Sequence, residues 1–155
     1  QAVLQGAVQD AGRDAGLESG KLNLGDIDQY VEDQITPLAG GALFDFKRTN
    51  YRSFTDVGRP EDFTDANDND IYDEGECFID ANSNEQGDAD VGAGGLGGAN
   101  DVVLYTVKVT YDRVFPLWKF IGQSSETSVS ASTTLRNQPF GPQAARPAKQ
   151  VCPTP

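Results

Sequence analysis

The chain has 155 residues, a length that suits one domain with a core of its own, and its formal net charge is −12. This charge disfavours nucleic acid and anionic membrane surfaces as partners, because both require a basic face. No apolar run approaches the ~20 residues that a membrane span requires. The chain begins at Gln1 and contains no Met, so we expect a mature or trimmed form of an exported protein.

Two helices are predicted in the N-terminal part, residues 1–37. In residues 1–17 apolar side chains recur at helical spacing, although the stripe is narrow and its members are mostly small: Leu4, Ala7, Val8, Ala11 and Ala15. Residues 24–35 repeat the pattern with larger side chains: Leu24, Ile27, Tyr30, Val31 and Ile35. Pro37 and the pair Gly40 and Gly41 end this second helix.

The first helix needs a partner surface, because a stripe of small side chains leaves an isolated helix marginal. Two interpretations are open: the helix packs at the edge of its own domain, or it packs against copies of itself. We expect the second, with Ala7, Val8 and Ala11 buried between neighbouring subunits of a helical homopolymer.

Three later segments alternate apolar and polar residues, which is typical of half-buried strands. They are residues 42–47, residues 101–111 and residues 129–135. The apolar segment Val114–Gly122 is predicted to cover the core between the last two strands, and residues 138–155 to form a Pro-rich extended tail. We therefore predict a single α+β domain over residues 1–155, with an N-terminal helix packed on a small antiparallel sheet.

The long connection between the first two strands, residues 56–100, has neither helical nor strand periodicity. Loops of this length are uncommon in compact domains unless they carry a function. Within it, residues 61–90 contain 12 acidic residues and no Lys or Arg, so the rest of the chain is neutral overall. Like charges at this density repel each other unless a cation lies among them.

The first half of the acidic segment follows the calcium-loop pattern of the EF-hand. Side-chain oxygens occupy positions 1, 3, 5, 9 and 12 of that loop, and a backbone carbonyl serves at position 7. The residues concerned are Asp65, Asn67, Asn69, Ile71, Asp73 and Glu76. The departure from the pattern is Asp70 at position 6, where Gly is usual.

A second copy begins 15 residues later and repeats positions 1, 3, 5, 7 and 9 with Asp80, Asn82, Asn84, Gln86 and Asp88. Position 12 is Val91, which has no carboxylate, so either Asp90 replaces it from position 11 or the two loops share ligands. An all-oxygen set without His suits calcium better than magnesium, which requires a strict octahedron. We predict a pair of calcium-binding loops; the alternative is a solvated acidic segment without metal.

The chain has two cysteines, Cys77 and Cys152. A disulfide between them is the expectation, and two free thiols are the alternative. On the chain-entropy model such a bridge would stabilise the fold by roughly 4 kcal/mol. It would also place the chain in an oxidising compartment.

Catalysis has little support in the sequence. The chain has no His, and neither cysteine has an evident base partner. Gly92, Gly94 and Gly97 match the spacing of a dinucleotide-binding loop, but that loop follows a strand and opens a helix. We expect a flexible connector there, no enzyme activity and no small-molecule substrate.

The order of these features resembles the TadE-like proteins, pilin-related subunits of the tight-adherence pilus system. The most specific stretches are YTVKVTYDRVFPL at residues 105–117 and TLRNQPF at residues 134–140. The resemblance runs from the first helix to about residue 141. It implies a pilin-like architecture, export, and copies of the chain or other pilus subunits as partners. The hydrophobic first half of a pilin helix has no counterpart in this sequence.

The sequence therefore predicts a structural subunit of an extracellular filament or pilus, stiffened by calcium. One alternative is a minor pseudopilin that primes or caps assembly. Another is a secreted, calcium-dependent module that binds carbohydrate or another surface.

Overall fold

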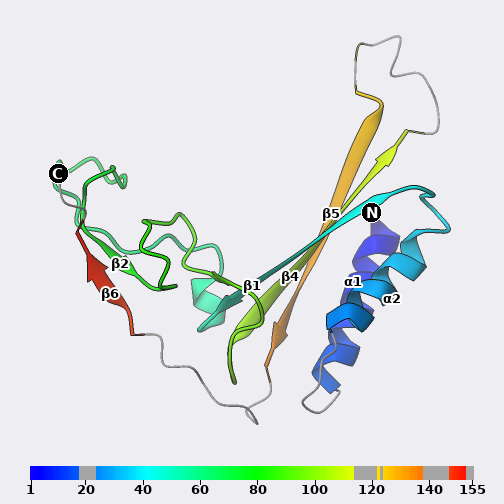
Figure 1. The fold of residues 1–155 in the computed structure, drawn as a ribbon, viewed down its shortest axis with the longest axis horizontal. Coiled ribbons are helices and arrows are strands. Elements are labelled where there is room, and N and C mark those ends of the chain that lie inside the picture. Colours follow the sequence, from blue (N-terminus) through cyan, green and yellow to red (C-terminus); the bar gives the residue numbers. More distant parts are fainter. Residues whose placement is uncertain (18–23, 114–121, 123, 138–146, 153–155) are drawn as a thin grey trace.

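The computed structural model describes residues 1–17, 24–113, 122, 124–137 and 147–152 (Figure 1). Two helices lie side by side against a four-stranded antiparallel sheet, which confirms the predicted α+β class. The acidic segment and the C-terminal strand form a second group of chain, which lies at the left of Figure 1, away from the two helices. In the part of the chain that the structure describes, neither helix is both long and apolar enough to cross a membrane.

Helices α1 (Ala2–Leu17) and α2 (Leu24–Ile35) match the predicted helices. They build the core together with the inner face of the sheet, and its fully buried members are Leu4, Val8, Ala11, Val31, Ile35, Tyr105, Val107, Val109 and Ala131. The side chains of Ala15 and Leu24 lie outside the described part.

The small side chains of α1 let this helix approach the sheet closely. A Cβ atom at Gly12 would lie only 2.9 Å from a Leu135 methyl carbon and 3.0 Å from one of Thr133. The amide of Gln5 also donates a hydrogen bond to the Ser132 carbonyl (3.1 Å), which ties α1 to the last strand of the sheet. The helix therefore has its partner surface within its own chain.

This packing corrects the expectation that the α1 stripe lies between subunits. Ala7, Val8 and Ala11 are 7 %, 0 % and 4 % exposed in the isolated chain, because α2 and the sheet already cover them. The edge-helix interpretation is the right one. Periodicity alone predicts that a face is buried, but it does not distinguish an internal partner from an external one.

The main sheet has the strand order β3-β1-β4-β5, and all of its pairings are antiparallel. Its strands are β1 (Leu43–Tyr51), β3 (Ala93–Gly94), β4 (Val102–Asp112) and β5 (Glu126–Arg136). The alternation predicted for the three longer strands is confirmed, because Tyr105, Val107 and Val109 face the helices while β5 exposes alternate Ser and Thr residues.

Residues 52–101, which contain the acidic segment, leave the sheet and return to it at neighbouring positions. Tyr51, the last residue of β1, lies opposite Val102, the first residue of β4. Between them the chain forms a 3-10 turn at Phe54–Asp56, strand β2 (Phe78–Asp80) and strand β3. Residues 52–101 are therefore an insertion whose two ends meet in one rung of the sheet.

A polar cluster fastens α2 to the sheet. Asp28 of α2 forms an ion pair with Arg48 of β1 and accepts a hydrogen bond from the Tyr105 hydroxyl (2.7 Å). The Arg48 guanidinium also lies over the Tyr105 ring, 4.8 Å from its centroid. Burial, and then the hydrogen bond to Asp28, raise the pKa of Tyr105, so the hydroxyl stays protonated and continues to donate.

The Gly-rich segment 92–98 is not the flexible connector that was expected. The buried amide of Asn50 donates to the carbonyls of Ala93, Gly94 and Gly95, at 2.8, 3.2 and 3.2 Å. Asn137 donates to the carbonyls of Leu96 and Gly98, at 2.6 and 2.8 Å. Side-chain amides from two different strand ends thus fix the path of this segment.

Two predicted features fall partly or wholly outside the described residues. The proposed core cover at Val114–Gly122 is one of them, since only Gly122, a turn residue, is described. In the Pro-rich tail, residues 147–152 are described, and they include strand β6 (Lys149–Val151). Strand β6 is extended as predicted and pairs with β2.

Candidate functional site

The first acidic loop is organised around Asp65. One carboxylate oxygen of Asp65 accepts hydrogen bonds from the backbone amides of Asn67 (3.3 Å) and Asn69 (3.2 Å), and the other accepts from Asp70 (2.8 Å). Donation from Asp70, and then from Asn69 and Asn67, lowers the pKa of the Asp65 carboxyl. The carboxylate is therefore held in its charged form at the centre of the turn.

The second loop repeats this arrangement around Asp80. Its carboxylate accepts from the amides of Ser83 (2.6 Å), Asn84 (3.3 Å) and Glu85 (3.0 Å). The backbone also repeats: φ is positive at residues 68 and 70 of the first loop and at residues 83 and 85 of the second. The loop pair predicted from spacing therefore adopts two copies of one backbone shape.

In each loop the side chains at positions 3, 5 and 9 converge. Asn67 and Asn69 donate to the same oxygen of Asp73, at 2.7 and 2.8 Å. In the second loop Asn82 and Asn84 donate to one oxygen of Asp88 at 2.8 and 2.6 Å. Ile71 and Gln86 are the residues expected at position 7. Their backbone amides donate to the side-chain oxygens of Asn69 and Asn84, two residues earlier in each loop (2.8 Å each).

Glu76 closes the first loop. One of its carboxylate oxygens accepts from the amide of Ala66 (2.7 Å) and the other from the amide of Asp73 (3.0 Å). The side chain therefore joins the beginning of the loop to its ninth position. Glu76 is only 8 % exposed, so these hydrogen bonds replace most of its hydration.

Glu61 does the same for the second loop, and sequence reasoning missed it. Its two carboxylate oxygens accept from the amides of Ala81 (2.7 Å) and Asp88 (3.2 Å), which are the equivalents of Ala66 and Asp73. Glu61 is 4 % exposed. It precedes Glu76 by 15 residues, the same offset that separates the two loops, and this shared offset is the signal that could have identified it.

Each loop thus receives its glutamate from the other repeat. The repeating unit is Glu-x3-Asp-x-Asn-x-Asn-x3-Asp, which starts at Glu61 and again at Glu76. Glu76, from the second unit, closes the loop of the first, and Glu61, from the first unit, closes the loop of the second. The exchanged contacts are therefore hydrogen bonds from backbone amides to these two glutamates.

Backbone pairing between the two units makes this exchange possible. Phe63 and Phe78 face each other in an antiparallel bridge, flanked by hydrogen bonds from Thr64 to Cys77 and from Ile79 to Asp62 (2.7 Å each). Antiparallel pairing at the start of both units brings each glutamate beside the opposite loop. Tyr72 packs edge-on against both phenylalanines, with centroid distances of 5.9 and 5.8 Å.

Asp90, the expected substitute at position 11, makes a different set of contacts. Its carboxylate accepts a hydrogen bond from the Tyr51 hydroxyl (2.8 Å) and one from the Gly92 amide (3.0 Å). Burial, and then the bond to Asp90, raise the pKa of Tyr51 to about 12. Asp90 thus anchors the end of the acidic segment to the end of β1.

The oxygen donors fit a hard divalent cation in type but are not gathered into a ready-made cage. Among the residues that the structure describes, no group of three or more His, Cys, Asp or Glu side chains is placed to hold a metal ion. In each loop two Asn side chains lie within hydrogen-bond distance of one Asp carboxylate, which they contact through their amide nitrogens. Carboxylate and amide oxygens are the ligands that calcium prefers.

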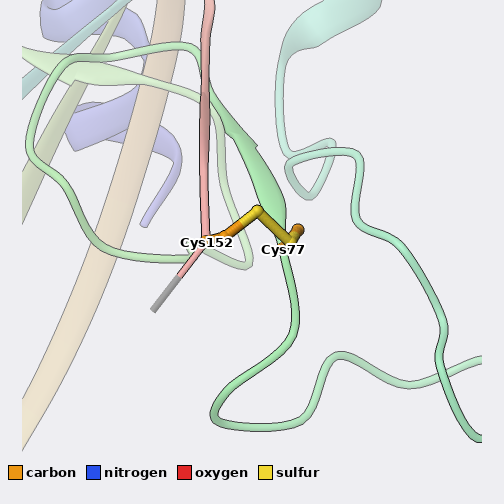
Figure 2. Close-up of a disulfide and its surroundings, with 2 residues drawn as sticks. All are labelled: Cys77 and Cys152. Atoms are coloured by element: carbon orange, nitrogen blue, oxygen red, sulfur yellow. A yellow bond between two sulfur atoms is a disulfide. The ribbon is translucent and has the colours of Figure 1, made fainter. Parts of the chain in front are cut away.

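Cys77 and Cys152 form the predicted disulfide, with their Cα atoms 4.1 Å apart. Figure 2 shows the bridge between the chain that enters β2 and the chain that leaves β6. Cys77 directly follows Glu76, so the covalent bond lies next to the residue that closes the first loop.

No protein-family model, curated protein or solved structure matches this chain.

Proposed function

We propose that this chain is a structural subunit of an extracellular filament or pilus, stiffened by calcium, as the resemblance to TadE-like proteins implies. The observation that carries the proposal is the double loop with exchanged glutamates, because it concentrates negative charge in a specific, repeated shape. The disulfide supports an extracellular location, since such bonds persist in oxidising compartments. An N-terminal helix packed on an antiparallel sheet is the architecture expected of a pilin-related subunit.

Calcium would be held by the two repeated sets of oxygen donors. The first set is Asp65, Asn67, Asn69, Ile71, Asp73 and Glu76; the second is Asp80, Asn82, Asn84, Gln86, Asp88 and Glu61 in place of Asp90. A bound dication supplies positive charge among carboxylates that otherwise repel one another. Because the glutamates are exchanged, two ions would fasten the two loops to each other.

Copies of the same chain are the proposed partners, and the contact surface cannot be the buried stripe of α1. Large apolar side chains are exposed elsewhere: Val3 is 53 % exposed, Leu38 65 % and Leu43 71 %. Leu38 lies in the turn between α2 and β1, and Leu43 is the first residue of β1. We propose that this turn contributes to the contact between subunits.

Electron microscopy of the purified protein tests the proposal. We expect fibres in calcium, and shorter or fewer fibres after chelation. The double variant Leu38→Glu/Leu43→Glu should abolish the fibres and keep the melting temperature, because both side chains are exposed. Gln34→Glu, at an exposed position near the end of α2, is the control. Discrete particles under all conditions would overturn the filament proposal and favour the secreted binding module.

A further inference from the structure

We propose that the Cys77–Cys152 disulfide and strand β6 form a redox-controlled clasp on the acidic loops. Reduction frees β6 from β2 and loosens both loops, while the helices and the main sheet stay folded. This inference goes beyond the proposed function, because it concerns the chain itself and holds with or without a bound ion.

Strand β2 is the central element of the acidic segment. One side of β2 pairs with residues 62–64 through the Phe63–Phe78 bridge, and the other side pairs with β6. Glu76 lies two residues before β2, and Asp80 is its last residue. The residues that close the first loop and open the second are therefore attached to the same short strand.

The covalent bond is the main attachment of β6. Only Val151 of this strand is partly buried, whereas Lys149 and Gln150 are exposed. Three residues of paired strand with so little apolar burial are marginal on their own. The disulfide keeps β6 next to β2 by removing most of the conformations that a free tail would explore.

Among the described residues, the helix–sheet core includes none from residues 52–101 or from β6. A pocket of about 220 Å³ lies beside β2, lined among others by Tyr51, Arg52, Ile79 and Ala148. Release of β6 takes no side chain out of the helix–sheet core, so the change stays local. The helix–sheet core should therefore remain folded when β6 is released.

An external thiol has access to the bridge, because Cys152 is exposed and Cys77 is half-buried. A thiolate of a dithiol reductant attacks Cys152 Sγ, the bond between the two cysteines breaks, and Cys77 leaves as a thiolate. The second thiol of the reductant then attacks the mixed disulfide and releases Cys152. The reductant becomes a disulfide, and the two protein thiolates take up its two protons.

Hydrogen exchange followed by mass spectrometry tests the clasp on the whole chain, without denaturant and with all divalent cations chelated. After treatment with dithiothreitol, we expect both cysteines to be alkylated and exchange in residues 62–90 to accelerate by about tenfold or more. Exchange in β4 should accelerate much less than in residues 62–90, because β4 belongs to the helix–sheet core. The double variant Cys77→Ser/Cys152→Ser should match the reduced protein, and Ser83→Ala, at an exposed site in the second loop, is the variant control.

Three results would overturn the clasp. Cysteines that resist reduction in the native protein would show that the bridge is closed to redox control. Unchanged exchange in residues 62–90 after full reduction would show that β6 does not hold the loops. If exchange in β4 accelerated as much as in residues 62–90, the bridge would stabilise the whole fold and not the acidic loops in particular. None of these outcomes depends on calcium, so the proposed function is judged separately by its own experiment.

Discussion

Glu61 and Glu76 occupy equivalent places in the two acidic loops, and each closes the loop of the repeat to which it does not belong. Both accept hydrogen bonds from two backbone amides, and both are nearly buried. The loops therefore depend on each other, because the removal of either glutamate opens a loop in the other unit.

The exchange predicts that Glu61→Gln damages a loop that begins 19 residues away in sequence. A glutamine can accept through one atom only, so one buried amide loses its partner, at a cost of about 1–3 kcal/mol without metal. Chemical denaturation measures this loss. Glu74→Gln, at an exposed neighbouring position, should change stability by less than about 0.5 kcal/mol. Equal stabilities for the two variants would contradict the exchange.

Calcium should stabilise the folded chain, because an ion that binds only the native loops shifts the equilibrium toward them. We expect a dissociation constant of roughly 10⁻⁴ to 10⁻³ M, typical of extracellular modules. At about 100 times that constant, each site contributes about 2.7 kcal/mol. Calorimetry with calcium, with chelator and with magnesium as the control ion checks this. A melting temperature that is the same in calcium and in chelator would remove the basis for the calcium proposal.

Ala11→Glu should unfold the domain. Ala11 is 4 % exposed in the core between α1, α2 and the sheet, and an unpaired charge there costs about 3–5 kcal/mol. Gln9→Glu adds the same charge on the exposed side of α1 and should be nearly neutral. Circular dichroism during thermal unfolding distinguishes the two. Normal stability of Ala11→Glu would mean that α1 does not pack as described.

Gly97→Ala should destabilise the fold, and Gly94→Ala should not. Gly97 has φ +66°, where a Cβ costs about 1–2 kcal/mol, and that Cβ would also press on the buried carboxylate of Asp101. Gly94 has an ordinary φ and open space around its Cβ position. Denaturant titrations of the two variants give the difference directly, and equal stabilities would argue against the pinned conformation of this segment.

Alkaline pH should weaken the attachment of α2. The folded state raises the pKa of Tyr105 above its ordinary value of 10.0, so its contribution is complete below pH 10 and is lost as the pH rises further. Tyr105→Phe removes the bond to Asp28 and should reduce this dependence; the part that remains comes from Tyr51, whose pKa is also raised. Urea unfolding across the alkaline range measures the slope. The prediction fails if wild type and variant lose stability in parallel above pH 10.

Local periodicity was enough to predict most of the fold. The bounds of α2 agree with the prediction at both ends, because its apolar side chains repeat strictly at helical spacing. Strands β4 and β5 follow from alternation for the same reason. Periodicity did not predict which surface covers α1. A stripe such as Leu4, Val8 and Ala11 is the same in sequence whether its own domain or another subunit covers it.

The candidate site was predicted in part. Spacing pointed to eleven loop positions through Asp88, because those residues follow the pattern of a single loop. Glu61 lies before both loops and reaches the second one only through antiparallel pairing, so no single-loop pattern includes it. The role of Asn50 as an anchor of the Gly-rich segment was equally invisible, because it depends on a contact 43 residues away along the chain.

The rung formed by Tyr51 and Val102 makes the acidic insertion portable. Both ends of residues 52–101 emerge at one point of the sheet, so a short hairpin turn between Tyr51 and Val102 would keep the register of β1 and β4, but it would remove strand β3 and the carbonyls to which Asn50 donates. Closing a longer loop costs only about 0.6 kcal/mol for each doubling of its length. A graft onto another sheet would need strand β6 and Cys152 as a separate C-terminal appendage, and counterparts of Asn50 and Asn137 on the host strands.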